Sequence, residues 1–549
     1  MGFFDSYKKL PLSYFVEKTY KLQNIEEINQ GFSQNDNFLF YRKDKFIKIY
    51  DRDCNHTVGK LFLNKEKAYC PLHGWSFNLK KGNYNNSSVV KKPIIETNLS
   101  EIDVPFIKVP LKKESLKTLD FKEKKDLTIR FLNHACLHFK LENGLSFASD
   151  PWVIGSAFCN GWWLQRESPE DVFKTLNSCD FIYISHNHPD HLHRFTLEKI
   201  RKDMPILTAG FKTGSTTSIL QSLGFKDIKE MDFGSRLVHE KDEFSLSVLK
   251  SGDFREDSGL LIEIGEFKGL LTVDSNLLNF GKLPEVDLVC SSFAGGASGF
   301  PLCFDNNDEK KKKEIVLRNA KGIKLLNKKI IKLTKSKYFL PYAGFFTEKA
   351  ERDKYIKLNN IKNNIEDYKN VCEENNCNLL NLNKHQIFKF KGKELISSFE
   401  DFSEKQKDKS IEEYINKIFA LPSQEVSELI INYFNQSEYK DNLTLDLITT
   451  DDSFNNFKER FEINFKNNKC IRKELYLDDK IQEFETIKSG NRYLRIKVRR
   501  EELVDVINNQ KPWEDLSIGF QCRIYRKPDT YNSDFWNYFT NSYVSKNLS

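Results

Sequence analysis

Two short stretches contain six of the ten histidines of this 549-residue chain, and both have the spacing of metal ligands. The first stretch consists of two mixed pairs, Cys54-x-His56 and Cys70-x-x-His73, with 13 residues between them. Two thiolates can hold one iron and two neutral imidazoles can hold a second iron. The two pairs therefore predict a Rieske [2Fe–2S] cluster that delivers electrons.

A structural zinc site is the alternative metal site for the same four residues. Zinc sites usually place both cysteines in one pair and both histidines in the other, whereas each pair here mixes the two types. Four core residues without a metal are the simplest alternative; free cysteines are common in protein cores, but this arrangement is not. We favour the Rieske interpretation, in which Trp75 covers the cluster.

The second stretch has the pattern H-x-H-x-D-H at 186–191, between a strand-like run at 180–185 and a helix-like run. Imidazoles at the end of a rigid strand can converge on one cation. The pattern resembles the main metal motif of the metallo-β-lactamase fold, in which an early Asp supports the site and a later carboxylate bridges two metals. Asp150 and Asp274 each end an apolar strand and match those two positions. The predicted ligands of this second metal are His186, His188, Asp190, His191 and Asp274.

Few histidines follow this motif. Two-zinc hydrolases of the metallo-β-lactamase fold generally take one or two more imidazoles from downstream, but only His239 and His385 follow His193. Asp253 stands where such a histidine often lies. The site is therefore predicted to be closer to a 2-His-1-carboxylate non-haem iron site than to a zinc-hydroxide site. His134 and Asp253 are further candidates for ligands or outer-shell partners.

The elements around these motifs indicate an α+β multidomain chain. Short alternating runs at 1–112 predict an all-β Rieske domain, and the lysine-rich segment 113–126 predicts a linker. Strand-like runs that alternate with helical ones at 127–375 predict a central αββα metallo-β-lactamase-like domain, including a long amphipathic helix at 308–335. Residues 376–549 predict a small C-terminal α+β region.

Composition narrows the class of protein. The 85 Lys and Arg exceed the 78 Asp and Glu by only seven charges, which does not favour a nucleic-acid partner. No apolar run approaches the length of a membrane helix, and the N-terminus lacks the pattern of a secretory signal. Eleven cysteines in so long a chain do not indicate a disulfide scaffold, so we expect a soluble, cytoplasmic enzyme.

Longer segments resemble the CMP-N-acetylneuraminate hydroxylase family, over essentially the whole chain. The segments that carry this resemblance are NHACLHFKL (133–141), DPWVIGSAF (150–158), DFIYISHNHPDHL (180–192), SFAGGASGFP (292–301), PYAGFF (341–346) and LSIGFQCRIYR (516–526). The sequence departs from the family at Ser292, where the family usually has Asp, and in a shorter loop between the two Rieske pairs. We expect these two departures to affect which substrate is used more than the type of reaction.

The resemblance implies a monooxygenase that uses O₂ to hydroxylate the N-acetyl methyl of CMP-N-acetylneuraminate to N-glycolyl. It implies a [2Fe–2S] cluster and a non-haem iron. It also implies electrons from NAD(P)H, which arrive through a reductase and a carrier such as cytochrome b5 or a ferredoxin-like protein. Two other functions stay open from the residues alone. One is a metal-dependent hydrolase with a regulatory Rieske module, and the other is a non-catalytic electron carrier or redox sensor.

Substrate contacts are less specific in the sequence. Three glycines within the loop 292–301 permit close backbone approach to a phosphate or sugar, although a tight turn needs the same residues. Trp162 and Trp163 can stack on a cytosine base, but aromatic pairs more often belong to the core. Arg166 and Lys354 are candidates for a phosphate contact, and exposure to solvent is the ordinary role of both.

Overall fold

Two eight-stranded mixed sheets form the centre of the molecule. The computed structural model describes residues 2–55, 59–70, 75–85, 89–253, 255–415, 421–475 and 492–548. The first sheet has the order β1-β20-β21-β22-β23-β24-β25-β27, and the second has the order β19-β18-β17-β14-β13-β12-β28-β29. The strands of the first sheet are β1 (Lys8–Pro11), β20 (Ser235–His239), β21 (Phe244–Lys250), β22 (Ser258–Ile264), β23 (Phe267–Val273), β24 (Leu288–Ser291), β25 (Tyr338–Pro341) and β27 (Asn378–Leu379). The strands of the second sheet are β12 (Asp126–Asn133), β13 (Cys136–Leu141), β14 (Ser146–Ser149), β17 (Phe181–Ile184), β18 (Ile206–Ala209), β19 (Ile228–Met231), β28 (Ile387–Lys391) and β29 (Glu394–Phe399).

The two sheets pack face to face, with helices on the outer faces. Phe147 of β14 contacts Phe244 of β21, with ring centroids 6.1 Å apart, across one continuous apolar core. A second core lies under the outer helices α1 (Val172–Asn177), α2 (Arg194–Leu197) and α3 (Ser215–Ser222). Because β14, β17 and β18 are parallel and covered on both faces, β17 consists only of buried residues. The predicted αββα layering of the central region is confirmed.

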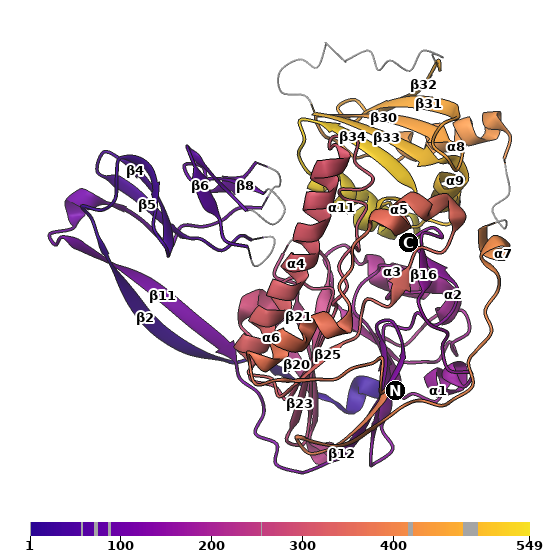
Figure 1. Cartoon of the computed structure of the whole chain (residues 1–549), viewed down its shortest axis with the longest axis horizontal. Helices are drawn as coiled ribbons and strands as arrows, with labels where there is room; N and C mark the ends of the chain where they lie inside the picture. Colours follow the sequence, from indigo (N-terminus) through magenta and orange to yellow (C-terminus); the bar gives the residue numbers. More distant parts are fainter. Residues whose placement is uncertain are drawn as a thin grey trace.

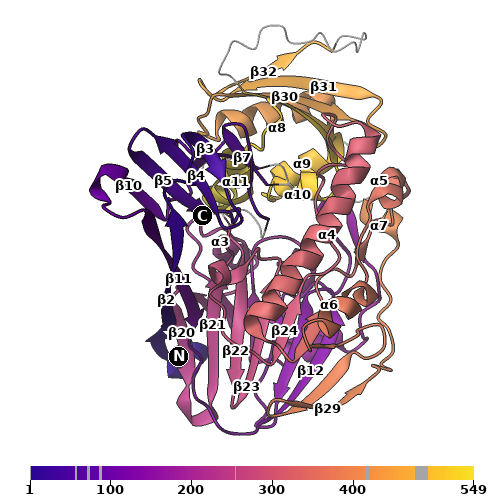
Figure 2. The same cartoon turned by 60° about the vertical axis from the view of Figure 1, so that its left-hand side comes forward.

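The predicted amphipathic helix is α4 (Glu309–Thr334), and it covers the outer face of the first sheet. The Asp308 carboxylate caps its first turn by accepting a hydrogen bond of 2.8 Å from the Lys311 amide. Ile315, Ile330 and Ile331 are buried on one side, which leaves most of the lysines on the solvent side. Figure 2 shows α4 running from the edge of the central sheets towards the C-terminal sheet.

The N-terminal module lies at the end of a long two-stranded ribbon, away from the central sheets (Figure 1). The ribbon pairs β2 (Tyr14–Asn24) with β11 (Phe106–Leu116) in one continuous antiparallel register. The module holds two four-stranded antiparallel sheets, each with its own small core. Their strands are β3 (Gly31–Gln34), β4 (Phe38–Lys43), β5 (Phe46–Asp51), β10 (Ile95–Asn98), β6 (Phe62–Asn64), β7 (Lys67–Tyr69), β8 (Ser76–Asn78) and β9 (Asn83–Tyr84).

The C-terminal region is a five-stranded sheet with the order β32-β31-β30-β33-β34, covered by helices on one face (Figure 1). Its strands are β30 (Leu443–Thr450), β31 (Phe457–Asn464), β32 (Lys469–Lys473), β33 (Arg492–Arg499) and β34 (Cys522–Lys527). Its helices are α8 (Ser423–Asn435), α9 (Arg500–Asn508), α10 (Glu514–Ile518), α11 (Ser533–Asn537) and α12 (Tyr543–Leu548). A Cβ on Gly161 would lie 2.0 Å from the Gly519 carbonyl oxygen, so the C-terminal and central backbones touch directly.

The division at 112, 126 and 375 stays a prediction, and several strands cross those limits. β1 pairs with β20 of the first central sheet, and β28 and β29 extend the second. The predicted linker 113–126 begins inside β11. Within the part of the chain that the structure describes, no helix is long and apolar enough to cross a membrane.

Candidate metal centre and catalytic cavity

Several parallel strands end at the same edge of the two central sheets. β14 is parallel to β17, and β23, β24 and β25 are parallel neighbours in the other sheet. Asp150 follows β14, His186 follows β17 after one serine, and Asp274 follows β23. Because the carboxyl ends of these strands meet, residues far apart in the sequence converge here, as in other open α/β sheets.

The five predicted ligands of the second metal lie together. His186 Nε2 is 2.9 Å from His188 Nδ1, and the His191 Nε2 atom is 3.3 Å from Asp190 Oδ2 and 3.5 Å from Asp274 Oδ2. His186 and His191 have no exposed surface, and Asp190 is 1% exposed. The atoms that approach one another are therefore ring nitrogens and carboxylate oxygens, the donors of a transition-metal site.

His134, which the sequence named as a further candidate, lies beside the predicted ligands. It lies in the tight turn between β12 and β13, and its Nε2 is 3.2 Å from Asp190 Oδ2. Two overlapping donor sets result, in each of which the ligand atoms lie within 4.8 Å of one another. The sets are His134–Asp190–His191 and His186–His191–Asp274.

Buried polar atoms without partners indicate that a cation belongs at this position. Asp190 Oδ1 and His191 Nε2 are inaccessible to solvent, and neither makes a hydrogen bond of regular geometry with a described residue, although carboxylate oxygens lie 3.3 and 3.5 Å from His191 Nε2. Leaving such groups unsatisfied costs about 1–3 kcal/mol each, or more when they are charged. A bound divalent cation removes that cost, so the donor set fits a metal.

Residues with a strained backbone conformation lie at the same edge of the two central sheets. His134, Asp150 and Val273 have positive φ values of 40°, 36° and 53°. A β-branched residue such as Val273 rarely adopts this conformation, which costs of order 1–3 kcal/mol. Strain of this kind persists where surrounding structure holds it and clusters at functional sites.

The imidazoles are held by a second layer of partners. Asp150 Oδ2 is 3.0 Å from His191 Nδ1 and accepts a hydrogen bond of 2.8 Å from the Ser185 hydroxyl. Ser185 Oγ is also 2.9 Å from His186 Nδ1. Such partners fix the orientation and tautomer of metal-binding histidines. The predicted supporting position of Asp150 agrees with these contacts.

Glu514 of the C-terminal α10 is a partner that the sequence did not indicate. Its Oε2 is 3.5 Å from His188 Nε2, and its Oε1 accepts a hydrogen bond of 3.2 Å from the Tyr531 hydroxyl. His188 Nδ1, which faces His186, is therefore the nitrogen left for a metal. The C-terminal region thus contributes directly to the orientation of a candidate ligand.

The carboxylates control the charge of the imidazoles. Burial lowers the pKa of His191, but Asp190, Asp274 and Asp150 outweigh it and raise that pKa well above its usual value. Burial, with the neighbouring His191 and His188, lowers the pKa of His186 well below its usual value. The candidate site therefore combines a neutral imidazole with a surplus of carboxylate charge, an arrangement suited to a cation.

Asp253, predicted as a ligand or outer-shell candidate, belongs to an ion cluster beside the metal donors. Its oxygens contact the Ser251 hydroxyl, the Arg255 guanidinium and the Asn276 amide at 2.7 to 2.9 Å. Asp257, which the sequence did not indicate, binds the other side of Arg255 at 3.1 Å. Burial raises the pKa of Asp257 to about 6. Arg255 also donates to the Asp274 carbonyl, so this cluster positions the strand end that carries Asp274.

The metal donors open into a cavity of about 400 Å³. Residues from every part of the chain line it, including His188, Asp190, Asp274, Ser292, Trp75 and Glu514. The loop 294–298 forms one wall, and Gly295 and Gly296 have φ values near 70°. A Cβ on Gly296 would lie 2.5 Å from Asn360 Oδ1, so the Asn360 side chain would have to shift, and the positive φ of Gly296 favours glycine without any ligand.

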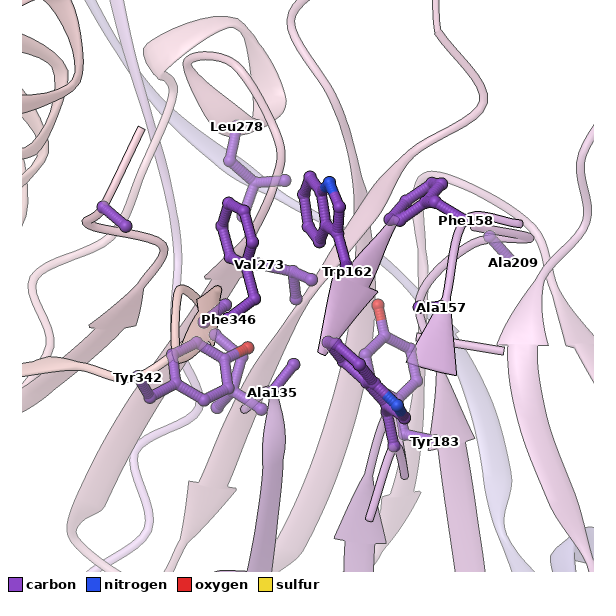
Figure 3. Close-up of a cluster of buried hydrophobic side chains, with 14 of the residues drawn as sticks. Ala135, Ala157, Phe158, Trp162, Tyr183, Ala209, Val273, Leu278, Tyr342 and Phe346 are labelled. Carbon is purple, nitrogen blue, oxygen red and sulfur yellow. The ribbon is translucent and has the colours of Figure 1, made fainter. Parts of the chain in front are cut away.

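Of the four predicted substrate contacts, only Trp162 lines this cavity. It belongs to a small sheet of β15 (Ser156–Ala157), β16 (Trp162–Leu164) and β26 (Phe346–Thr347), and its ring stacks on Phe346 with centroids 3.6 Å apart (Figure 3). Trp163 packs instead against Tyr414. Arg166 donates to the Leu382 carbonyl and stacks on Phe345, and Lys354 pairs with Glu351 at the surface. Trp163 and Arg166 therefore pack within the protein, and Lys354 is an exposed surface charge.

The candidate cluster ligands Cys54 and Cys70 are both buried in one core of the N-terminal module. Cys70 follows β7, and its amide donates a hydrogen bond of 2.8 Å to the Trp75 carbonyl across the tip of the β7–β8 hairpin. The other two candidates, His56 and His73, lie outside the described residues. Two buried thiols at turns in the same core fit one half of a [2Fe–2S] cluster.

Asp515, beside Glu514, is expected to make the stability of the protein pH-dependent. Its side chain is 3% exposed, and its Oδ1 has no hydrogen-bond partner among the described residues. Burial raises its pKa from 3.8 to about 7, so folding favours the protonated form and stability falls as pH rises through this range. Relative to the parent, Asp515→Asn should gain up to about 4 kcal/mol of unfolding free energy between pH 4 and pH 7. Urea unfolding of both proteins between pH 4 and pH 7 measures this gain, and Asp36→Asn at an exposed position is the control. A stability difference between Asp515→Asn and the parent that stays constant with pH would contradict the raised pKa of Asp515.

Comparison with known proteins gives matches for the module and for the whole chain. A family profile described as the Rieske [2Fe-2S] domain matches residues 14–98. The chain is 30% identical over 544 residues to the cytidine monophosphate-N-acetylneuraminic acid hydroxylase of Macaca mulatta, covering 91% of this chain and 88% of that protein. It is 30% identical over 542 residues to the protein of the same name from Mus musculus, covering 91% and 90% of the two chains.

Among solved structures, part of the chain is similar to an isothiocyanate hydrolase from Delia radicum gut bacteria. That match has 15% identity and a TM-score of 0.30, and it covers 46% of this chain and 95% of the other. The metallo-beta-lactamase fold protein YhfI from Bacillus subtilis matches with 16% identity and a TM-score of 0.26, covering 40% of this chain and 86% of the other.

Proposed function

Because the chain belongs to the cytidine monophosphate-N-acetylneuraminic acid hydroxylase family, we propose that it hydroxylates the N-acetyl group of CMP-N-acetylneuraminate, or of a related nucleotide-activated sugar, to N-glycolyl. As a Rieske-containing member of that family, it is a monooxygenase. The observation that carries the substrate proposal is the shared cavity, in which the metal donors meet residues of the Rieske module and of the C-terminal region.

The proposed iron ligands are His186, His188, Asp190, His191 and Asp274. We add His134 as a further ligand, because it forms a donor set with Asp190 and His191. Iron held there would supply the activation of O₂ that an unreactive C–H bond requires. The chain's own groups hold the ligands in place: Asp150 orients His191, Ser185 orients His186 and Glu514 orients His188. The electrons would come from NAD(P)H through a donor protein of the cytochrome b5 or ferredoxin type.

A cationic side chain in the cavity supports an anionic substrate. Arg526 lines the cavity, and its side chain is 11% exposed. Its guanidinium lies 4.8 Å from the Phe304 ring centroid. Its Nε donates to Asp529 at 2.7 Å, and its Nη groups donate to no described residue. Two parallel N–H groups are the geometry that binds a phosphate or a carboxylate, and a CMP-linked sialic acid carries both.

Arg526→Gln is expected to weaken CMP binding by about ten- to a hundredfold, because a hydrogen bond to a charged group contributes about 1.5–3 kcal/mol. Binding of the uncharged nucleoside cytidine should change much less. Titration calorimetry with CMP and with cytidine measures both affinities. Lys527→Gln, with the same loss of charge at the exposed next residue, is the control. Equal losses for the two ligands would rule out phosphate recognition by Arg526.

The proposed function is tested by anaerobic reduction of the iron-loaded protein, followed by O₂ and CMP-N-acetylneuraminate. Mass spectrometry should detect a product one oxygen atom heavier than the substrate. A fully loaded protein that forms no such product would reject the substrate. Turnover of a phosphodiester or lactone without O₂ or reductant, with zinc at 186–191, would favour the hydrolase instead.

A further inference from the structure

The Rieske module reaches the catalytic cavity of its own chain. Although the module is carried on the ribbon of β2 and β11, its β6–β9 sheet lies on the side that faces α4 and α11 (Figures 1 and 2). Trp75, the residue before β8, lines the cavity together with His188, Asp190 and Asp274. The cavity is therefore closed in part by an electron-transfer module and in part by the metal donors.

Trp75 also belongs to the core that holds the two cluster cysteines. Its side chain is 7% exposed and packs in the same apolar cluster as Cys54 and Cys70. Its ring lies edge-on to Tyr84, with centroids 5.2 Å apart. Tyr84 is buried in the same cluster as the two cysteines, and its hydroxyl accepts a hydrogen bond of 2.9 Å from the Asn55 amide, next to Cys54. One indole thus touches both the surroundings of the cluster ligands and the cavity.

We propose that electrons pass from the Rieske module into the catalytic cavity of the same chain, with Trp75 as the contact between them. The inference rests on the proposed hydroxylation. That reaction converts a C–H bond and O₂ into C–OH and water and consumes two electrons and two protons. A Rieske cluster carries one electron at a time, so an external one-electron donor protein reduces the module twice in each cycle. No second copy of the chain is needed to complete the site.

The first test follows the oxidation of the reduced cluster by its visible absorbance after O₂ is mixed with the iron-loaded protein and substrate. The rate should be independent of protein concentration. Trp75→Leu should slow cluster oxidation by at least about tenfold, the smaller of the effects on activity that follow removal of partners of metal ligands. The absorbance spectrum of the oxidised cluster should stay unchanged. Trp75→Phe should keep most of the rate. Trp163→Leu, at a buried tryptophan outside this cavity, is the matched control.

The second test mixes two variants that each lack one centre. Cys70→Ser removes a cluster ligand and His191→Ala removes a candidate iron ligand, so electrons within one chain cannot complete the reaction in either variant. The mixture should form no more product than the two variants form when they are assayed separately. Recovery of product, or a cluster oxidation rate that rises with concentration, would overturn the proposal. So would a rate for Trp75→Leu equal to that of the parent.

The two tests separate this proposal from the proposed substrate. Cluster oxidation is read without reference to the product. A Trp75-dependent rate without hydroxylated sugar would therefore reject the substrate and retain the path, whereas normal product with a Trp75-independent rate would reject the path alone.

Discussion

Substitution of His191 by alanine is expected to abolish both metal binding at the second centre and hydroxylation. His191 is the one residue common to the two donor sets, and its two ring nitrogens contact Asp150 on one side and Asp190 and Asp274 on the other. Without it, three carboxylates remain in a buried site with no central ligand. Loss of a partner of a metal ligand typically costs 10- to 100-fold, so loss of this ligand should exceed about 100-fold.

Metal content and product formation are measured on the same sample of His191→Ala. The [2Fe–2S] absorbance should stay unchanged, because Cys54 and Cys70 lie in a separate core. His239→Ala is the matched control: this histidine pairs with Asp242 near the surface of the first sheet, and its loss should alter neither quantity. Full iron content in His191→Ala would contradict the proposed ligand set.

Substitution of Arg499 by alanine is expected to destabilise the protein by about 3–5 kcal/mol, the cost of breaking a buried ion pair. Arg499 and Asp353 are each 1% exposed, and Arg499 Nη1 lies 2.6 Å from Asp353 Oδ1. The guanidinium also donates to the Gln521 side chain and to the Arg352 carbonyl. Its loss leaves Asp353 charged and buried without its partner, at the contact between the C-terminal sheet and the central region.

Urea unfolding measures this loss, and the matched control is Arg472→Ala at an exposed position of β32, expected to cost less than about 0.5 kcal/mol. The double variant Arg499→Met/Asp353→Leu should recover most of the stability, because apolar residues of similar volume often replace buried ion pairs at little cost. A single variant as stable as the parent would show that the contact does not stabilise the protein. Since α9 and α10 follow β33 directly, displacement of Glu514 should accompany the destabilisation of Arg499→Ala.

The sequence alone was enough to propose a metal at the central site, because the main candidate ligands are neighbours. His186, His188, Asp190 and His191 follow one buried strand, so local structure alone brings them to one edge. Asp150 and Asp274 could be predicted because each ends an apolar strand, and strand ends of this fold meet. Asp253, a candidate for a ligand or an outer-shell partner, lies beside the candidate donors, and its oxygens are occupied by Ser251, Arg255 and Asn276.

Other features depended on contacts between distant segments. His134 and Asp190 are 56 positions apart, and His188 and Glu514 are 326 positions apart. No periodicity or spacing reports such pairs, since they form only when hairpin turns, sheets and the C-terminal region pack together. For the same reason the sequence could name Arg166 and Trp163 only as candidates for substrate contact, and packing directs both side chains elsewhere.

The sequence by itself thus predicted two metal centres, because the types and short spacings of candidate ligands can be seen without a structure. The tertiary structure placed the candidates His134 and Trp75 at the site and added two groups that the sequence did not indicate, the carboxylate of Glu514 and the guanidinium of Arg526. The shortage of downstream histidines remains a property of the sequence. Only the packed structure shows that an upstream histidine, His134, lies beside Asp190, because the two residues are brought together by the folding of the second sheet.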